Sequence, residues 1–308
     1  MKNLTRPAFE RATAFIQTYG RPLEQQLLAY QFGGETKAGV LTALTAYQNE
    51  DGGFGRALEP DLRTDASSAV ATQQAFNVLR AIEAPVDEPL VRRSIDYLLK
   101  SYDAGRSVWP IVPPEVEAAP HAPWWTHVDA ERNFGSFLAN PRAALVGFLH
   151  DYSSLVYPEF LTQVTGLVLN YLDVLPDKME MHDLLCYISL AETKGLPAAD
   201  QARVQAKLRQ IAPHSVEMNP EKWGDYELLP LGVISAPDHF LADVVAPEVI
   251  HLNLDRLVDS QQPDGAWAPP WNWAFVNEAA WQAAEQDWKG YLTLTNLKLL
   301  QAFGRIEA

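Results

Sequence analysis

Apolar residues recur at helical spacing along most of the chain, with Leu, Ala and Gln prominent, while alternating runs of β-branched residues are scarce. This pattern predicts an all-α protein. Glycines and prolines fall where the helices should stop. Twelve helices are expected, enough for about six helical hairpins, at 5–19, 22–32, 36–48, 66–82, 88–102, 141–152, 158–174, 180–194, 198–211, 226–236, 246–260 and 290–304.

A seven-residue pattern occurs twice, near opposite ends of the chain. Residues 48–54 read QNEDGGF and residues 261–267 read QQPDGAW, so Gln, Asp, Gly and an aromatic residue stand at the same four offsets. Each copy lies between two apolar helical stretches, which is typical of stacked helical hairpins. Eroded copies are expected at 103–109 and 219–225. In the full copies, we expect Gln48 and Gln261 to bond backbone groups at helix ends, and Asp51 and Asp264 to bond backbone amides in the turns.

The repeat resembles the Q-x-x-D-G-x-W/F repeat of terpenoid cyclases and protein prenyltransferase β-subunits. The resemblance implies a single α/α toroid domain over 1–308, in which an inner ring of helices surrounds a central cavity and an outer ring encloses it. Prenyltransferases carry Pro-Asp-x-Cys, whose Asp and Cys bind zinc, whereas this chain reads Pro60-Asp61-Leu62-Arg63. The D-x-D-D string of class II terpene cyclases does not occur in the sequence. The resemblance therefore implies the fold without the activities.

Charge and composition narrow the possible partners. The net charge of −15 should repel nucleic acid and anionic membranes, and the sequence contains neither an apolar run of membrane-spanning length nor an apolar N-terminal signal segment. A single cysteine, Cys186, suits a reducing compartment, and its apolar helix favours a packed thiol over a metal ligand. We expect a cytoplasmic protein without metal or cofactor, and the sequence leaves the oligomeric state open.

Two carboxylates next to Pro60 are the leading candidates for chemistry. Glu59 and Asp61 could serve as acid and base, with Arg63 of the same loop lowering the pKa of one carboxyl group and burial raising that of the other. Asp65 is either an N-cap for the helix expected at 66 or a further contact to substrate. The loop should lie at the mouth of the cavity.

Two long linkers, 103–140 and 261–289, supply the remaining candidates, because loops of this length are usually functional when they are rich in aromatic residues. In the first, His121 could act as an acid or base, with Trp124 and Trp125 as a stacking surface or as a plug of the toroid. A metal site of His121, His127 and Asp129 is a weaker alternative, since the spacing matches no compact ligand pattern. In the second linker, the faces of Trp271 and Trp273 suit either a sugar or a cation. Because these loops follow repeat turns that the toroid would place at one rim, we expect Glu59, Asp61, His121, Trp124 and Trp273 to face one cavity.

Three functions remain open from the sequence. The leading hypothesis is an enzyme of hydrolase or lyase type that acts on a small neutral ligand, such as a glycan fragment, in an acidic, tryptophan-lined cavity. The alternatives are an isoprenoid-handling protein without the standard catalytic motifs and a toroid that binds a ligand or partner without catalysis. Few cations accompany the candidate loops, which favours a neutral ligand over a diphosphate.

Overall fold

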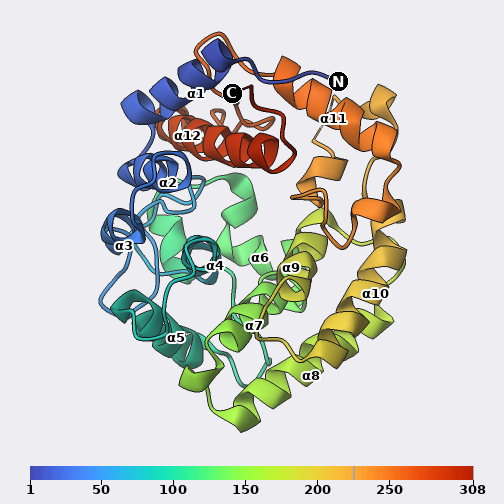
Figure 1. Ribbon diagram of the computed structural model, residues 1–308. Helices are drawn as coiled ribbons and strands as arrows, with labels where there is room; N and C mark the ends of the chain where they lie inside the picture. Colours follow the sequence, from blue (N-terminus) through green and yellow to red (C-terminus); the bar gives the residue numbers. More distant parts are fainter. Residues whose placement is uncertain (225, 308) are drawn as a thin grey trace. The chain divides into compact units, whose positions relative to one another are not determined.

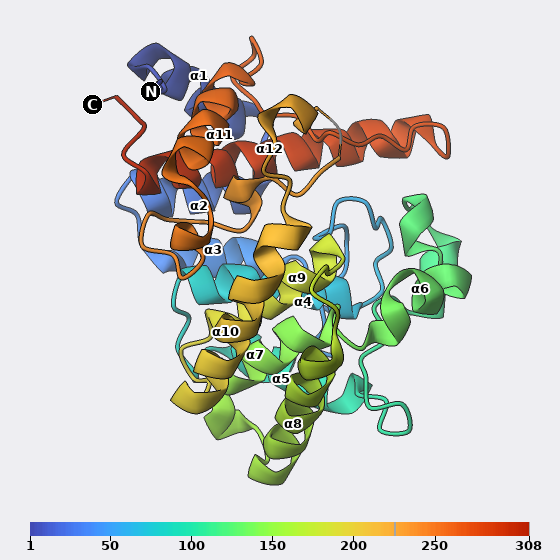
Figure 2. The same ribbon diagram turned by 90° about the vertical axis from the view of Figure 1, so that its right-hand side faces the viewer.

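The computed structural model describes residues 1–224 and 226–307, and this part of the chain is all-α, as the sequence predicts. Within it, no strand is formed, and the few β-bridges are isolated pairs of residues. Figures 1 and 2 label the α-helices in chain order. They are α1 (Arg6–Tyr19), α2 (Pro22–Phe32), α3 (Lys37–Thr45), α4 (Ala69–Ala81), α5 (Pro89–Ser101), α6 (His127–Asn133), α7 (Arg142–Asp151), α8 (Pro158–Val174), α9 (Met181–Ala191), α10 (Ala198–Ser215), α11 (Pro247–Asp259) and α12 (Glu278–Ala302).

Most helices begin at signals that are visible in the sequence. Proline occupies the first turn of α1, α2, α5, α8 and α11, where its missing N–H costs no hydrogen bond. Side-chain caps begin three others: Ser68 accepts a hydrogen bond at α4, Glu180 at α9 and Asn277 at α12. Local chemistry therefore explains why the predicted ranges agree closely for these helices, except at the start of α12.

Three expectations about helices were wrong. The range 226–236 forms only a 3-10 turn, Pro230–Gly232, because Pro230 removes a donor that a continuous helix would need. The linker 103–140 contains α6 and several 3-10 turns. The linker 261–289 ends early, because α12 begins at Glu278, where Asn277 caps it, rather than at 290.

The chain divides into two compact units. Unit 1 comprises Met1–Ala43 and Ala212–Ala308, and unit 2 comprises Leu44–Ile211. In unit 1, α12 packs against both α1 and α2, and the two ends of the chain pair as Leu4 with Ile306. The backbone bonds from Leu4 N to Arg305 O, 2.7 Å, and from Glu307 N to Leu4 O, 3.0 Å, close this pairing.

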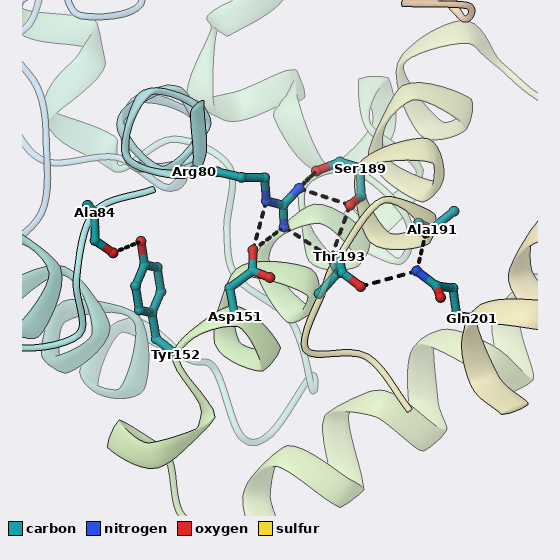
Figure 3. Close-up of polar contacts among 8 residues, drawn as sticks. All are labelled: Arg80, Ala84, Asp151, Tyr152, Ser189, Ala191, Thr193 and Gln201. Atoms are coloured by element: carbon teal, nitrogen blue, oxygen red, sulfur yellow. Dashed lines mark hydrogen bonds and ion pairs between the residues drawn. The ribbon is translucent and has the colours of Figure 1, made fainter. Parts of the chain in front are cut away.

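Unit 2 is organised around α7, which packs against α4, α8 and α9. A polar network fixes these helices, and Figure 3 shows Arg80 of α4 at its centre. The Arg80 guanidinium donates to Asp151 Oδ2 at 2.7 Å, to Ser189 Oγ at 2.9 Å and to Thr193 Oγ1 at 3.0 Å. Gln201 of α10 continues the network by donating to Ala191 O at 2.9 Å. One side chain of α4 is thus bonded to the end of α7, to α9 and to the turn after α9.

Beside the network, the Tyr152 hydroxyl donates to Ala84 O at 3.3 Å, and burial raises the pKa of this phenol to about 12. Tyr152 therefore remains a neutral donor over the physiological range.

The toroid and the single domain remain predictions. Among the described helices, none combines the length and apolar character that crossing a lipid bilayer demands.

Candidate functional site

The two full repeat copies form matching turns. In the first copy, Gln48 Nε2 donates to Gly52 O at 3.0 Å and to Leu90 O at 3.1 Å. In the second, Gln261 Nε2 donates to Gly265 O and to Ala8 O, both at 3.0 Å. Each glutamine thus ties its own turn to the start of a neighbouring helix, and the prediction that both bond backbone groups is confirmed.

The aspartates of the two turns also have the same role. Asp51 Oδ1 accepts from Gly53 N at 2.9 Å, and Asp264 Oδ1 accepts from Ala266 N at 3.0 Å. Gly52 and Gly265 adopt φ of 94° and 93°, which glycine tolerates best. The structural interpretation of both aspartates is therefore confirmed, and neither is a catalytic candidate.

The aromatic position anchors each turn to the helix that follows it. Phe54 N donates to Thr72 Oγ1 of α4 at 3.2 Å, and Trp267 N donates to Thr293 Oγ1 of α12 at 3.1 Å. The Trp267 indole also donates to Leu257 O at 2.9 Å, near the end of the preceding helix. Trp109 makes the corresponding bond to Leu98 O at 2.7 Å. This shared contact supports 103–109 as an eroded copy of the repeat.

The other expected eroded copy, 219–225, cannot be compared in full, because Asp225 lies outside the described residues. Its Trp223 indole donates to Glu217 O at 2.9 Å, which is a local contact and not a bond to a preceding helix.

The loop that carries Glu59 and Asp61 is compact and buried. The exposed fractions of these two residues are 4% and 2%, and Leu58 and Leu62, which flank them in the sequence, are also buried. Two successive turns, closed by Leu58 N to Gly55 O and by Leu62 N to Glu59 O, hold this arrangement. Burial of two adjacent acids is uncommon and marks them as structurally or chemically specialised.

The backbone pairs this loop with the segment that carries His121. Arg63 N donates to Pro120 O at 3.0 Å, and Ala122 N donates to Asp61 O at 2.9 Å, so Leu62 and His121 face each other as a bridged pair. The sequence predicts that these two loops meet at one cavity; within unit 2 their backbones pair, and the shared cavity stays a prediction. The predicted approach of Trp273 to the same cavity concerns the other unit and remains a prediction.

His121 is held in a defined orientation. Its Nδ1 lies 2.9 Å from Ala122 O, a contact that assigns the proton to Nδ1 in the neutral ring. Its Nε2 then lies 3.7 Å from Glu117 Oε2. The ring nitrogen of His121 that faces Glu117 is thus Nε2.

The remaining polar residues of the loop lie differently. Arg63 is half-buried, and its guanidinium donates to Pro60 O at 3.3 Å. Asp65 is exposed, and the expectation that it caps the following helix was wrong. Ser68 is the cap, with Oγ accepting from Ala71 N at 3.1 Å, because Ser68 N is fixed by Phe54 O and α4 begins at Ala69.

The tryptophan pair divides into a buried and a half-buried ring. Trp125 is buried and stacks on Phe134 with a centroid distance of 5.1 Å, which favours the packing role. Trp124 is half-buried in the 3-10 turn Pro123–Trp125, close in sequence to His121. Trp124 is therefore the better candidate for a ligand contact.

The metal alternative gains no support from the surroundings of His127 and Asp129. His127 Nδ1 lies 3.3 Å from Val112 O, and Asp129 pairs with Arg132 at 2.9 Å. Among residues 1–224 and 226–307, no group of three or more His, Cys, Asp or Glu side chains is arranged to hold a metal ion.

The late tryptophans belong to unit 1. Trp273 is fully buried and packs edge-on against Trp281 at 5.8 Å, so its surroundings are those of a core residue. Trp271 is half-buried and contacts the rings of Tyr226 at 5.7 Å and Trp288 at 5.1 Å. Of the two rings, Trp271 is the one with surface available to a ligand.

Sequence reasoning missed a second polar cluster in unit 2. Asp183, in the first turn of α9, has its pKa raised to about 6 by burial and by the nearby Glu180 carboxylate, against a bond from the Asn140 backbone. Cys186, one turn later, is buried; its thiol donates to Asn140 Oδ1 at 3.5 Å, and burial raises its pKa strongly. The packed-thiol interpretation of Cys186 therefore holds. The acid three residues before the only cysteine, on one helix face, was the available signal.

Comparisons of the chain with protein-family models, curated proteins and solved structures give no match.

Proposed function

We propose that the protein is an acid–base enzyme that acts on a small neutral polar ligand, with a glycan fragment as the favoured class. The proposed site, here called the acidic loop site, consists of Glu59, Asp61 and His121, with Glu117 beside the histidine. The observation that carries the proposal is the backbone pairing of 61–63 with 120–122, which brings two buried carboxylates and an oriented histidine into one part of unit 2.

These residue types suit glycoside chemistry. Most glycosidases use two carboxyl groups, one as the acid that protonates the leaving oxygen and the other as nucleophile or base. Glu59 and Asp61 are the proposed pair, and His121 would exchange a proton at Nε2. The half-buried face of Trp124 would pack against the apolar face of a sugar ring.

The local charge supports a neutral ligand. Glu59, Asp61 and Glu117 lie in or next to the paired segments, so three acidic groups accompany one arginine, Arg63, in 59–63 and 117–122. A phosphorylated or polyanionic substrate would need a surplus of cations, whereas the chain as a whole carries −15. The same charge supports the expectation that nucleic acid is not a partner.

The test measures turnover of a panel of aryl glycosides and short oligosaccharides by the full-length wild type and by the variants Glu59→Gln and Asp61→Asn. We expect each amide variant to lose at least about 100-fold in kcat, because the proton-transfer role is removed, while the melting temperature changes little. The matched control is Asp96→Asn, an exposed carboxylate on α5 of the same unit, which should retain full activity.

Two results would count against the proposal. Variants that lose stability together with ligand binding, with no turnover detected for the wild type, would identify Glu59 and Asp61 as structural acids. Binding of a glycan without turnover by the wild type would identify a binding protein instead of an enzyme.

A further inference from the structure

Arg142, the first residue of α7, is a buried cation without a carboxylate partner among the described residues. Its exposed fraction is 3%, and its guanidinium donates from Nε to Leu138 O at 2.9 Å and from Nη1 to Ser107 O at 3.1 Å. Both partners are neutral carbonyls. The guanidinium carbon also lies 5.8 Å from the centroid of the Tyr171 ring.

Other enclosed arginines of this chain are neutralised. Arg21 pairs with Glu24 at 2.6 Å, Arg80 with Asp151 at 2.7 Å and Arg305 with Asp255 at 3.1 Å. The chain has 39 acidic residues for 24 lysines and arginines, so carboxylates are plentiful. A guanidinium that is buried among neutral groups in such a chain retains a large uncompensated charge, which costs several kcal/mol in general.

A second orphan group lies in the same surroundings. The hydroxyl of Tyr102 is enclosed and has no hydrogen-bond partner in the described chain, although a buried phenol normally finds one. Tyr102 is among the groups that interact electrostatically with the Arg142 guanidinium, together with Tyr171 and Tyr187. The Tyr102 ring is fixed by Trp109 at 4.8 Å and by Phe160 at 5.0 Å, so the hydroxyl cannot turn freely to another partner.

From these two orphan groups, we infer that Arg142 and Tyr102 form a binding site for the carboxylate group of a small organic acid. Two donors, a guanidinium nitrogen and a phenol, match the two oxygens of one carboxylate. A phosphate dianion would need more positive charge than this single arginine supplies. Tyr102 and Tyr171 are both half-buried, so the cluster reaches the surface of unit 2 along these rings.

The proposed carboxylate site is independent of the acidic loop site, since it consists of other residues and requires no catalysis. Arg142 also holds Leu138 O and Ser107 O, and that structural role accounts for two of its five donors. The structural role does not account for the missing counter-charge or for the buried hydroxyl of Tyr102.

The experiment titrates the full-length protein with sodium acetate and, separately, with sodium phosphate, at an ionic strength held constant with sodium chloride. Intrinsic tryptophan fluorescence is one readout, because Trp109, one of the nine tryptophans, contacts Tyr102, and the melting temperature is a second readout. We expect saturable acetate binding and a rise in melting temperature that follows the same isotherm.

Two variants locate the site. Tyr102→Phe should fold at least as stably as the wild type without acetate, since it removes an unpartnered buried hydroxyl, yet bind acetate about 5-fold more weakly. Arg142→Lys should weaken acetate binding at least about 10-fold, because lysine lacks the planar fork. Arg203→Lys, an exposed residue paired with Asp173, is the control and should bind normally.

Any of three results would overturn the inference: no saturable effect of acetate on the wild type, an acetate effect of equal size in Tyr102→Phe, or saturation by phosphate and not by acetate. If Arg142→Lys fails to fold, Tyr102→Phe alone decides the outcome.

Discussion

Asp183 shows how one half-buried carboxylate can lower the stability of the folded protein at neutral pH. An acid in the first turn of α9 is favoured by the helix dipole, and the Asn140 backbone bond favours its charged form. Burial and the neighbouring Glu180 carboxylate outweigh both effects and raise the pKa to about 6. At neutral pH, Asp183 is therefore an ionised group in surroundings that prefer its neutral form.

The pH dependence of stability follows from this direction. Between the ordinary pKa of Asp and about 6, the folded protein keeps a proton that the unfolded chain has lost, so the Asp183 contribution falls as pH rises through this window. We expect Asp183→Asn to stabilise the protein at pH 7 to 8, by on the order of 1 to 3 kcal/mol, and to have little effect near pH 4.

Urea unfolding of the wild type and Asp183→Asn across that pH range measures the difference. Glu159→Gln, an exposed acid in the first turn of α8, is the control, and it should not reproduce the gain. A loss of stability in Asp183→Asn at pH 7 would show that the native state uses the charged carboxylate.

Individual residues also show which surroundings of a side chain can be predicted from the sequence and which cannot. The approach of the Glu59 loop to the His121 loop was predicted from the repeat, because both loops follow repeat turns that were expected at one rim of the toroid; the backbone pairing itself was not predicted. The surroundings of Asp183, Arg142 and Tyr102 were not predictable either, since each depends on which neutral or charged groups other helices bring to it. The sequence indicated Asp65 as the cap of the helix expected at 66, whereas α4 begins later and is capped by Ser68, whose N–H is fixed by Phe54 O.

At the scale of elements, the two repeat turns are equivalent parts that should respond alike to mutation. A Cβ on Gly52 would lie 2.2 Å from Arg93 O, and one on Gly265 would lie 2.5 Å from Arg11 O. Both glycines also have left-handed φ. We expect Gly52→Ala and Gly265→Ala each to cost about 1 to 3 kcal/mol from backbone strain alone, with the close contacts adding to it.

Chemical denaturation of both variants measures the losses, and Gly166→Ala in α8 serves as the control. Gly166 has free space around it inside a helix, so alanine there should stabilise by about 0.5 to 1 kcal/mol. A cost in only one of the two turn variants would contradict the equivalence of the copies.

Element prediction succeeded where helix signals are local and failed where composition misleads. The ranges 22–32 and 158–174 were correct because Pro22 and Pro158 mark their starts. The range 226–236 has the apolar composition of a helix, but its buried residues lie in and around the 3-10 turn Pro230–Gly232. The start of α12 was missed because tryptophans at 271–288 indicated a loop, although Asn277 is a recognisable cap.

At the scale of the molecule, the division into two units raises the question of cooperativity. The chain passes from unit 1 to unit 2 within α3, at Ala43 and Leu44, and returns within α10, at Ile211 and Ala212. Both crossings thus fall inside helices and not in linkers, where domain boundaries usually lie. If either unit unfolded alone, α3 and α10 would both be interrupted, because each of these helices has residues in both units.

We therefore predict that the protein unfolds in one calorimetric transition, as a single domain over 1–308 would, with a van't Hoff enthalpy equal to the calorimetric one. Gln210→Pro tests the mechanism, because proline at this exposed position of α10 removes a helical hydrogen bond next to the crossing. This variant should broaden the transition or split it, whereas Gln210→Ala should leave its shape unchanged. Two transitions in the wild type would mean that the units are separate domains, and the helical crossings would then transmit too little free energy to couple them.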